Sequence, residues 1–117
     1  MRIGNVGTEK PIVRIDDETY VDVSDIAPDF DEAFFGSGGI DRIRPAVEQR
    51  AAAGLVSRFA GERIGAPFAR PHQILCIGLN YSDHAAETGQ IVPDEPILFT
   101  KSPNTLIGPN DEVRIPR

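Results

Sequence analysis

The chain has 117 residues, of which 40% are hydrophobic and 26% charged, as is typical of a soluble globular protein. Its 12 Lys and Arg against 18 Asp and Glu give a net charge of −6, which argues against a general nucleic-acid binder. The apolar runs are too short to cross a membrane, and the first residues lack the apolar core of a secretion signal. The single cysteine, Cys76, excludes an internal disulfide, so we expect a cytoplasmic protein.

Alternating apolar residues near the N-terminus predict short β-strands. The runs 1–6, 12–15 and 19–23 alternate in polarity, and turn-forming residues at 7–9 and 16–18 separate them. Successive strands with short turns form an antiparallel meander, and alternation indicates one buried face.

The next elements are a helix and a short strand. Apolar residues at helical spacing predict a helix over 40–53, and Gly54 can end it. Pro45 either marks the first turn of this helix or kinks it. The segment 26–39 is less regular, and 55–59 is a candidate strand.

A domain boundary is predicted near residues 66–71. We divide the chain into a small N-terminal domain, 1–68, and the beginning of a second domain, 69–117. The continuous apolar run Ile74–Ile77 predicts a strand buried on both faces. Cys76, inside that run, is expected to be a buried and inert thiol.

The second domain continues with a short helix between strands. Ser82 or Asp83 can cap a helix that runs to Glu87 and ends at Gly89. The apolar stretch 96–100 predicts another strand. Beyond it, the turn 108–111 leads into a last predicted strand at 112–115.

His84 and Glu87 are the most informative pair for chemistry. Three residues apart on a helix, they share a face and can touch. A carboxylate that fixes the imidazole tautomer suits a general base that deprotonates water. The spacing alone favours an exposed pair on a surface helix. The other histidine, His72, lies just before the buried strand and is interpreted as structural.

Three further residues could bind a substrate. Lys101 follows an apolar strand and could hold a carboxylate as a point charge, although a solvated lysine is the more common case. Asn80 and Tyr81 offer an amide and a phenol beside the histidine helix, and could equally serve in turn formation and packing.

The chain lacks other familiar site motifs. It has no P-loop, no GxGxxG and no HExxH. The carboxylate clusters at 16–18 and 29–32 lack ligand-loop spacing and are interpreted as solvated surface. We therefore assign no metal ligand within this chain.

The stretch QILCIGLNYSDHAAETG, followed by PDEPILFTKSPNTLIGPNDEVRIPR, resembles the fumarylacetoacetate hydrolase family. The bacterial branch that handles acylpyruvates and related dioxo acids is the most similar. The resemblance runs from about Arg70 to Arg117 and rests on G-L-N-Y-x-D-H-x-x-E, FTKSP and GPND. It implies a mainly β (α+β) fold: a small N-terminal β-rich domain, then the first strands of a fumarylacetoacetase-like mixed β-sandwich roll. It also implies a homodimer or larger assembly.

The resemblance further implies an activity. Members bind Mg²⁺ or Mn²⁺ and cleave a carbon–carbon bond in a small 2,4-dioxo acid, an acylpyruvate or a diketo sugar acid. His84 and Glu87 match the pair that activates water, and Lys101, Asn80 and Tyr81 would bind substrate. The segment Ala85–Pro96 resembles a mobile lid.

The family's metal ligands, a Glu-x-Glu motif and a later Asp, are absent from this sequence. We therefore expect the metal ligands beyond residue 117, and expect the chain to be the N-terminal part of the enzyme, inactive alone. Two alternatives stay open. One is a family decarboxylase or isomerase acting on a related oxo acid, and the other is a non-catalytic assembly or binding module.

Overall fold

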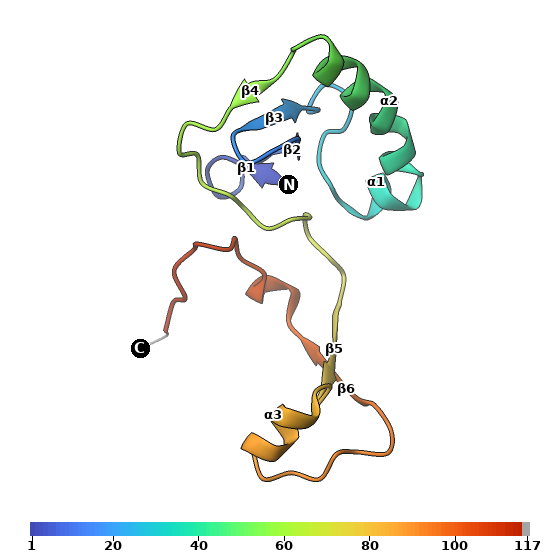
Figure 1. Cartoon of the computed structure of the whole chain (residues 1–117), viewed down its shortest axis with the longest axis vertical. Helices are drawn as coiled ribbons and strands as arrows, with labels where there is room; N and C mark the ends of the chain where they lie inside the picture. The colour runs from blue at the N-terminus through green and yellow to red at the C-terminus, as the bar shows by residue number, and fades with distance from the viewer. Residues whose placement is uncertain (116–117) are drawn as a thin grey trace. The chain divides into compact units, whose positions relative to one another are not determined.

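The computed structural model describes residues 1–115, which form two compact units. Unit 1 contains Met1–Pro71 and the described residues from Leu106 onward, and unit 2 contains His72–Thr105. All strand pairs are antiparallel, and strands outnumber helices (Figure 1). The predicted mainly β (α+β) class is therefore confirmed.

Unit 1 is built on a four-stranded sheet. Its strands are β1 (Arg2–Ile3), β2 (Lys10–Arg14), β3 (Thr19–Asp22) and β4 (Ser57–Arg58), in the order β1-β2-β3-β4. Each strand pairs with the next along the chain, so the predicted antiparallel meander is confirmed.

Both faces of this sheet are covered, whereas alternation predicted one buried face. Ile12 and Tyr20 lie on one face, and Val13 and Val21, which are directly paired, lie on the other. On the first face, the cluster that contains Ile12 and Tyr20 packs against Phe59, whose ring centroid lies 4.8 Å from that of Tyr20. The second cluster joins the sheet to the helices through a shared set of apolar residues: Val21, Val23, Ala27, Phe30, Phe34 and Ile43.

Two helices complete unit 1: α1 (Glu32–Gly36) and α2 (Gly39–Ala52). The bounds of α2 lie within one residue of those predicted, and it continues through Pro45. α1 was not predicted; its N-cap is Asp31, whose carboxylate accepts the Phe34 N–H at 3.0 Å. No helix in residues 1–115 has the length and apolar character needed to span a membrane.

Unit 2 is a two-stranded ladder with one short helix. β5 (Ile74–Gly78) pairs with β6 (Ile97–Lys101), and α3 (Ser82–Glu87) lies between them in sequence. A 3₁₀ turn, Pro103–Thr105, follows β6. The strands at 74–77 and 96–100 were thus predicted within one residue.

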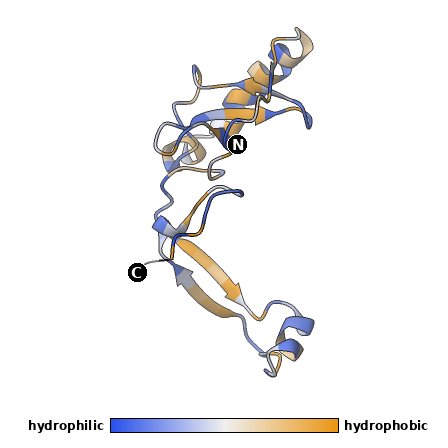
Figure 2. Ribbon diagram, turned by 90° about the vertical axis from the view of Figure 1, so that its left-hand side faces the viewer, coloured by the Kyte–Doolittle hydropathy of each residue, from blue (hydrophilic) through white to orange (hydrophobic). Residues whose placement is uncertain are grey.

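The burial predicted for β5 was wrong. Leu75 is 66% and Ile77 48% exposed, and Cys76 is partly rather than fully buried. Every residue of β6 is exposed. Figure 2 shows apolar colouring along β5 and the first part of β6, whose end is hydrophilic. A ladder of two strands has too few layers to bury a side chain on both faces, so the apolar run alone overestimated burial.

The strand predicted at 112–115 is also absent from the structure, and these residues are exposed. A strand needs a partner for its backbone N–H and C=O groups, and none of the strands within residues 1–115 pairs with this segment. The turn before it was correctly predicted: the Asp111 N–H donates to the Gly108 carbonyl at 3.2 Å.

Candidate functional site

α3 is the element that carries the candidate base, and it starts just after β5. The chain leaves β5 at Gly78, and Leu79 takes a left-handed conformation with φ 48°. Such a backbone costs a non-glycine residue roughly 1–2 kcal/mol, so the tight turn is held by its surroundings. Tyr81, extended at φ −125°, is the N-cap, and not Ser82 or Asp83 as predicted.

The C-terminal end of α3 is closed by backbone hydrogen bonds. Gly89, at φ 65°, donates its N–H to Ala86 at 3.1 Å, and Gln90 donates to Ala85 at 2.8 Å. This pair of bonds is a Schellman motif, in which glycine takes the left-handed position. Gly89 therefore ends the helix as predicted. Ala85 is 1% exposed and marks the inward side of α3.

His84 and Glu87 both lie on α3 with exposed side chains. Their spacing of three residues places them on neighbouring positions of the helix surface. Within residues 1–115, no hydrogen bond or ion pair joins the imidazole to this carboxylate. Both groups are therefore open to a water molecule or a substrate.

Asp83 takes part in the local geometry in a way that sequence reasoning missed. Its carboxylate accepts the backbone N–H of His84 at 2.9 Å, which satisfies a donor in the first turn of α3. An Asp in the first turn of the predicted helix is the signal that could have indicated this contact, since its carboxylate can accept a free backbone N–H there.

The candidate substrate-binding residues separate into two places. Asn80 and Tyr81 are exposed and directly precede α3. Lys101 is the last residue of β6 and pairs with Ile74, at the end of the ladder opposite Gly78. Four residues at about 3.3 Å each put about 13 Å between these ends. The structure therefore places the first two beside α3 and Lys101 at the other end of the ladder.

Among residues 1–115, no group of three or more His, Cys, Asp or Glu side chains is arranged to hold a metal ion. Asp111, in the GPND turn, makes its contacts with Arg63 at 2.6 and 2.5 Å and with the Gly108 N–H at 2.7 Å. These hydrogen bonds lower the pKa of Asp111. The described residues thus do not provide a metal site.

Comparison with known proteins supports the assignment of this region. Residues 73–117 match the family model described as Fumarylacetoacetate (FAA) hydrolase C-terminal. The family resemblance is confirmed. This segment includes β5, α3, β6 and the GPND turn, so the candidate base lies within it.

Similar proteins occur in Burkholderia multivorans, Burkholderia lata and Burkholderia ambifaria, each carrying the name "putative hydrolase". Each is 41% identical to this chain over 118 aligned positions, which include 100% of the chain. The chain spans about 40% of the length of each of these relatives. The similarity therefore covers both units, whereas the family model covers only the later part.

Proposed function

We propose that this chain supplies the general base of a metal-dependent hydrolase of the fumarylacetoacetate hydrolase family. The substrate would be a small 2,4-dioxo acid, an acylpyruvate or a diketo sugar acid, cleaved at a carbon–carbon bond. One observation carries the proposal: within the segment that matches the family, α3 exposes His84 and Glu87 at a spacing of three residues.

In this proposal His84 acts first. Its neutral imidazole accepts a proton from water, and the resulting hydroxide attacks the carbonyl carbon distal to the substrate's carboxylate. The bond from that carbon to the neighbouring methylene carbon breaks, and its electron pair forms the enolate of pyruvate. A proton returned to this enolate yields pyruvate, and the other product is a carboxylic acid. Glu87 would orient the imidazole and stabilise its protonated form.

The metal requires ligands that residues 1–115 do not provide. Mg²⁺ and Mn²⁺ prefer carboxylate and carbonyl oxygen ligands, and residues 1–115 contain no cluster arranged to supply them. We infer that the ligands lie in the part of the longer relatives that this chain does not cover. A bound cation would supply Lewis-acid stabilisation of the developing negative charge.

The remaining groups have subsidiary roles in the proposal. Asn80 and Tyr81 precede α3 and could orient the substrate by hydrogen bonds. Lys101 would hold a substrate carboxylate; because it lies at the other end of the β5–β6 ladder, we expect it to affect substrate binding and not the proton transfer. We also propose a homodimer or larger assembly for the intact enzyme.

The experiment uses a chimaera, because the chain spans only about 40% of the length of its relatives. The aligned 40% of the Burkholderia multivorans protein is replaced by this chain, and pyruvate release from acylpyruvates is measured with Mg²⁺ or Mn²⁺. We expect His84→Ala to lower kcat by roughly 10²- to 10⁴-fold. His72→Ala is the matched control, because it removes the other histidine of the chain.

Further variants separate the roles. Glu87→Gln should lower kcat less than His84→Ala, with Glu48→Gln, an exposed glutamate on α2, as its control. Lys101→Met should raise KM with little change in kcat. Undiminished turnover in His84→Ala would contradict the assigned base. Release of CO₂ without hydrolysis would instead favour a decarboxylase, and a folded chimaera that binds but converts none of the acids would favour a binding module.

A further inference from the structure

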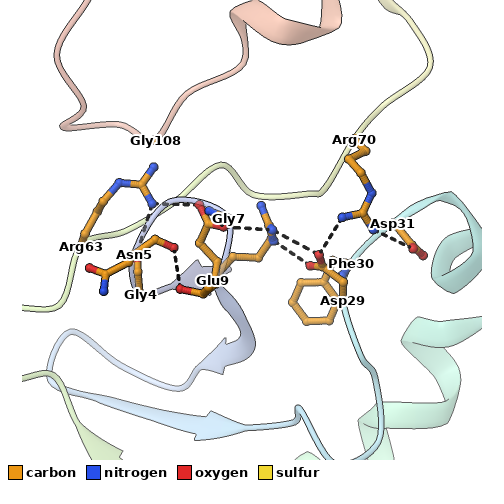
Figure 3. Close-up of polar contacts among 12 residues, drawn as sticks. Gly4, Asn5, Gly7, Glu9, Asp29, Phe30, Asp31, Arg63, Arg70 and Gly108 are labelled. Atoms are coloured by element: carbon orange, nitrogen blue, oxygen red, sulfur yellow. Dashed lines mark hydrogen bonds and ion pairs between the residues drawn. The ribbon is translucent and has the colours of Figure 1, made fainter.

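A chain of alternating charges crosses unit 1. It consists of six side chains, each in contact with the next, and we call it the charge ladder: Asp111, Arg63, Glu9, Arg2, Asp29 and Arg70. Three carboxylates alternate with three guanidinium groups in the ladder, and Arg70 at its end also contacts a fourth carboxylate, that of Asp31. Figure 3 shows the labelled members Arg63, Glu9, Asp29 and Arg70 with their contacts.

The contacts near Arg63 form one half of the ladder. Its guanidinium binds Asp111 in a bidentate manner, at 2.6 and 2.5 Å, and donates to Glu9 at 2.9 Å. The second oxygen of Glu9 accepts from the Gly7 N–H at 2.9 Å and from Arg2 at 3.4 Å. Bidentate arginine–carboxylate pairs have a fixed geometry as well as a strong attraction.

The other half runs from Arg2. Its guanidinium contacts Asp29 at 2.7 and 3.2 Å, and the Asp29 carboxylate also accepts the Phe30 N–H at 2.8 Å. Arg70 lies 3.7 Å from Asp29 and 3.4 Å from Asp31.

The middle of the ladder is well shielded from water. The side chains of Arg2 and Glu9 are 10% and 7% exposed, and that of Asp29 is 15% exposed. Burial acts to raise the pKa of Glu9, but hydrogen bonds, including that from Arg63, and the charge of Arg2 outweigh it and the pKa is lowered. Salt screens such shielded pairs much less than surface pairs.

The two ends of the ladder coincide with the two places where the chain leaves and re-enters unit 1. Arg70 is the residue before Pro71, the last residue of the first segment of this unit. Asp111 follows Leu106, where the unit resumes. Beside Asp111, Gly108 is buried, and a Cβ there would collide with the carbonyl of Ile64. The GPND turn is therefore closely seated on unit 1.

We propose that the charge ladder acts as a clasp: it fixes to unit 1 the two chain segments that flank residues 72–105. In this role Asp111 of the GPND turn is a docking residue for Arg63. The clasp concerns unit 1 alone and does not depend on the proposed catalysis. This proposal has a distinguishing consequence, which we call transmission. Removing the charge of Glu9, in the middle of the ladder, should weaken the contacts at both ends, although Glu9 contacts neither Asp111 nor Arg70.

The test measures hydrogen exchange of single amides in the full 117-residue chain. At one end, the Asp111 N–H donates to Gly108; at the other, the Ala69 N–H donates to Phe30 at 2.7 Å. Arg63→Met should speed exchange at Asp111 about tenfold or more, because it removes both charge-assisted hydrogen bonds to the Asp111 carboxylate. The control, Arg58→Met, removes an arginine of unit 1 that pairs with Glu18 outside the ladder and should leave both amides unchanged.

Glu9→Gln breaks the middle of the ladder and tests transmission. We expect faster exchange at both Asp111 and Ala69, with a smaller change at Val21 in the core. Faster exchange at Asp111 alone would show separate ion pairs and would overturn the clasp, as would equal changes at all three amides.

A second comparison applies even if Glu9→Gln unfolds unit 1. Asp29→Asn and Asp111→Asn are conservative changes at sites that share no contact, and independent sites should have additive effects on the urea midpoint. The clasp predicts a double variant whose midpoint shift is clearly smaller than the sum of the two single shifts. Additive shifts would overturn it.

Discussion

Two glycines three residues apart should respond oppositely to the same substitution. A Cβ at Gly39, the first residue of α2, would overlap the ring of Phe34 and lie 2.5 Å from the Phe34 carbonyl oxygen. A Cβ at Gly36 would meet nothing within 4 Å. Neither glycine has a positive φ, so an alanine can adopt the backbone at both positions, and the difference reports mainly the packing against Phe34.

The magnitudes follow from that geometry. An alanine at an unobstructed helical position stabilises by about 0.5–1 kcal/mol, because the unfolded chain loses freedom. Overpacking a filled core costs about 1–3 kcal/mol, and Phe34 is only 6% exposed within the cluster that joins β3 to both helices. We therefore expect Gly39→Ala to destabilise unit 1 by about 1–2 kcal/mol and Gly36→Ala to stabilise it slightly.

Urea unfolding followed by far-UV circular dichroism measures the difference. With a slope of about 1 kcal/mol per molar urea for a small unit, Gly39→Ala should lower the midpoint by about 1–2 M, and Gly36→Ala should raise it or leave it unchanged. The double variant Gly39→Ala/Phe34→Leu should lose less stability than the sum of the two single variants, because the smaller side chain relieves the overlap with the ring. Equal midpoints for the two single variants would refute the reasoning.

Three further predictions concern the core, acid stability and unit 2. Ile12→Ala should destabilise unit 1 by about 2–4 kcal/mol in urea unfolding, because Ile12 is 0% exposed, whereas Val6→Ala, at a 77% exposed site, should change it by less than about 0.5 kcal/mol. Burial acts to raise the pKa of Asp22, but hydrogen bonds led by that from Lys10 lower it from 3.8 to about 2. This lowered pKa contributes stability to the folded state that is fully present above pH 3.8 and is lost as pH falls through 2. Asp22→Asn should therefore be less stable than the wild type at neutral pH, and the difference should disappear below pH 2. The isolated chain should self-associate through unit 2, and Leu98→Lys, at a 68% exposed position, should reduce its sedimentation-equilibrium mass; an unchanged monomer in both proteins would contradict this.

The sequence pattern predicted most of the regular elements because they are local. Alternation identified the strands of the meander, and helical spacing identified α2 to within one residue. α1 was missed although Asp31 carries a usable N-cap signal, since adjacent phenylalanines and the following glycines masked so short a helix. The capping residue of α3 was also mispredicted, because Ser82 and Asp83 are common caps and the backbone conformation of Tyr81 has no local signature.

Burial and long-range contacts were less accessible. The apolar run of β5 was interpreted as a strand covered on both faces, but burial depends on which elements pack against it, and Leu75 is 66% exposed. The partnership of Arg63 with Asp111 joins residues 48 positions apart, so no spacing rule could predict it. For the candidate site, local sequence placed His84 and Glu87 on a helix, whereas the position of Lys101 depended on the register of β5 with β6.

The two units differ in how far they account for their own stability, and this decides where the proposed chemistry can be tested. Unit 1 has a sheet with both faces covered and residues such as Ile12 and Val23 fully enclosed. Unit 2 supports α3 on two strands, and a two-stranded ladder is marginally stable in water. A general base must stay within hydrogen-bond reach of its water, so its support must be rigid. The Burkholderia relatives are longer than this chain, which spans about 40% of each. The isolated chain is therefore a poor place to test the proposed base, whereas loss of turnover on changing His84 in the chimaera would report on the base itself.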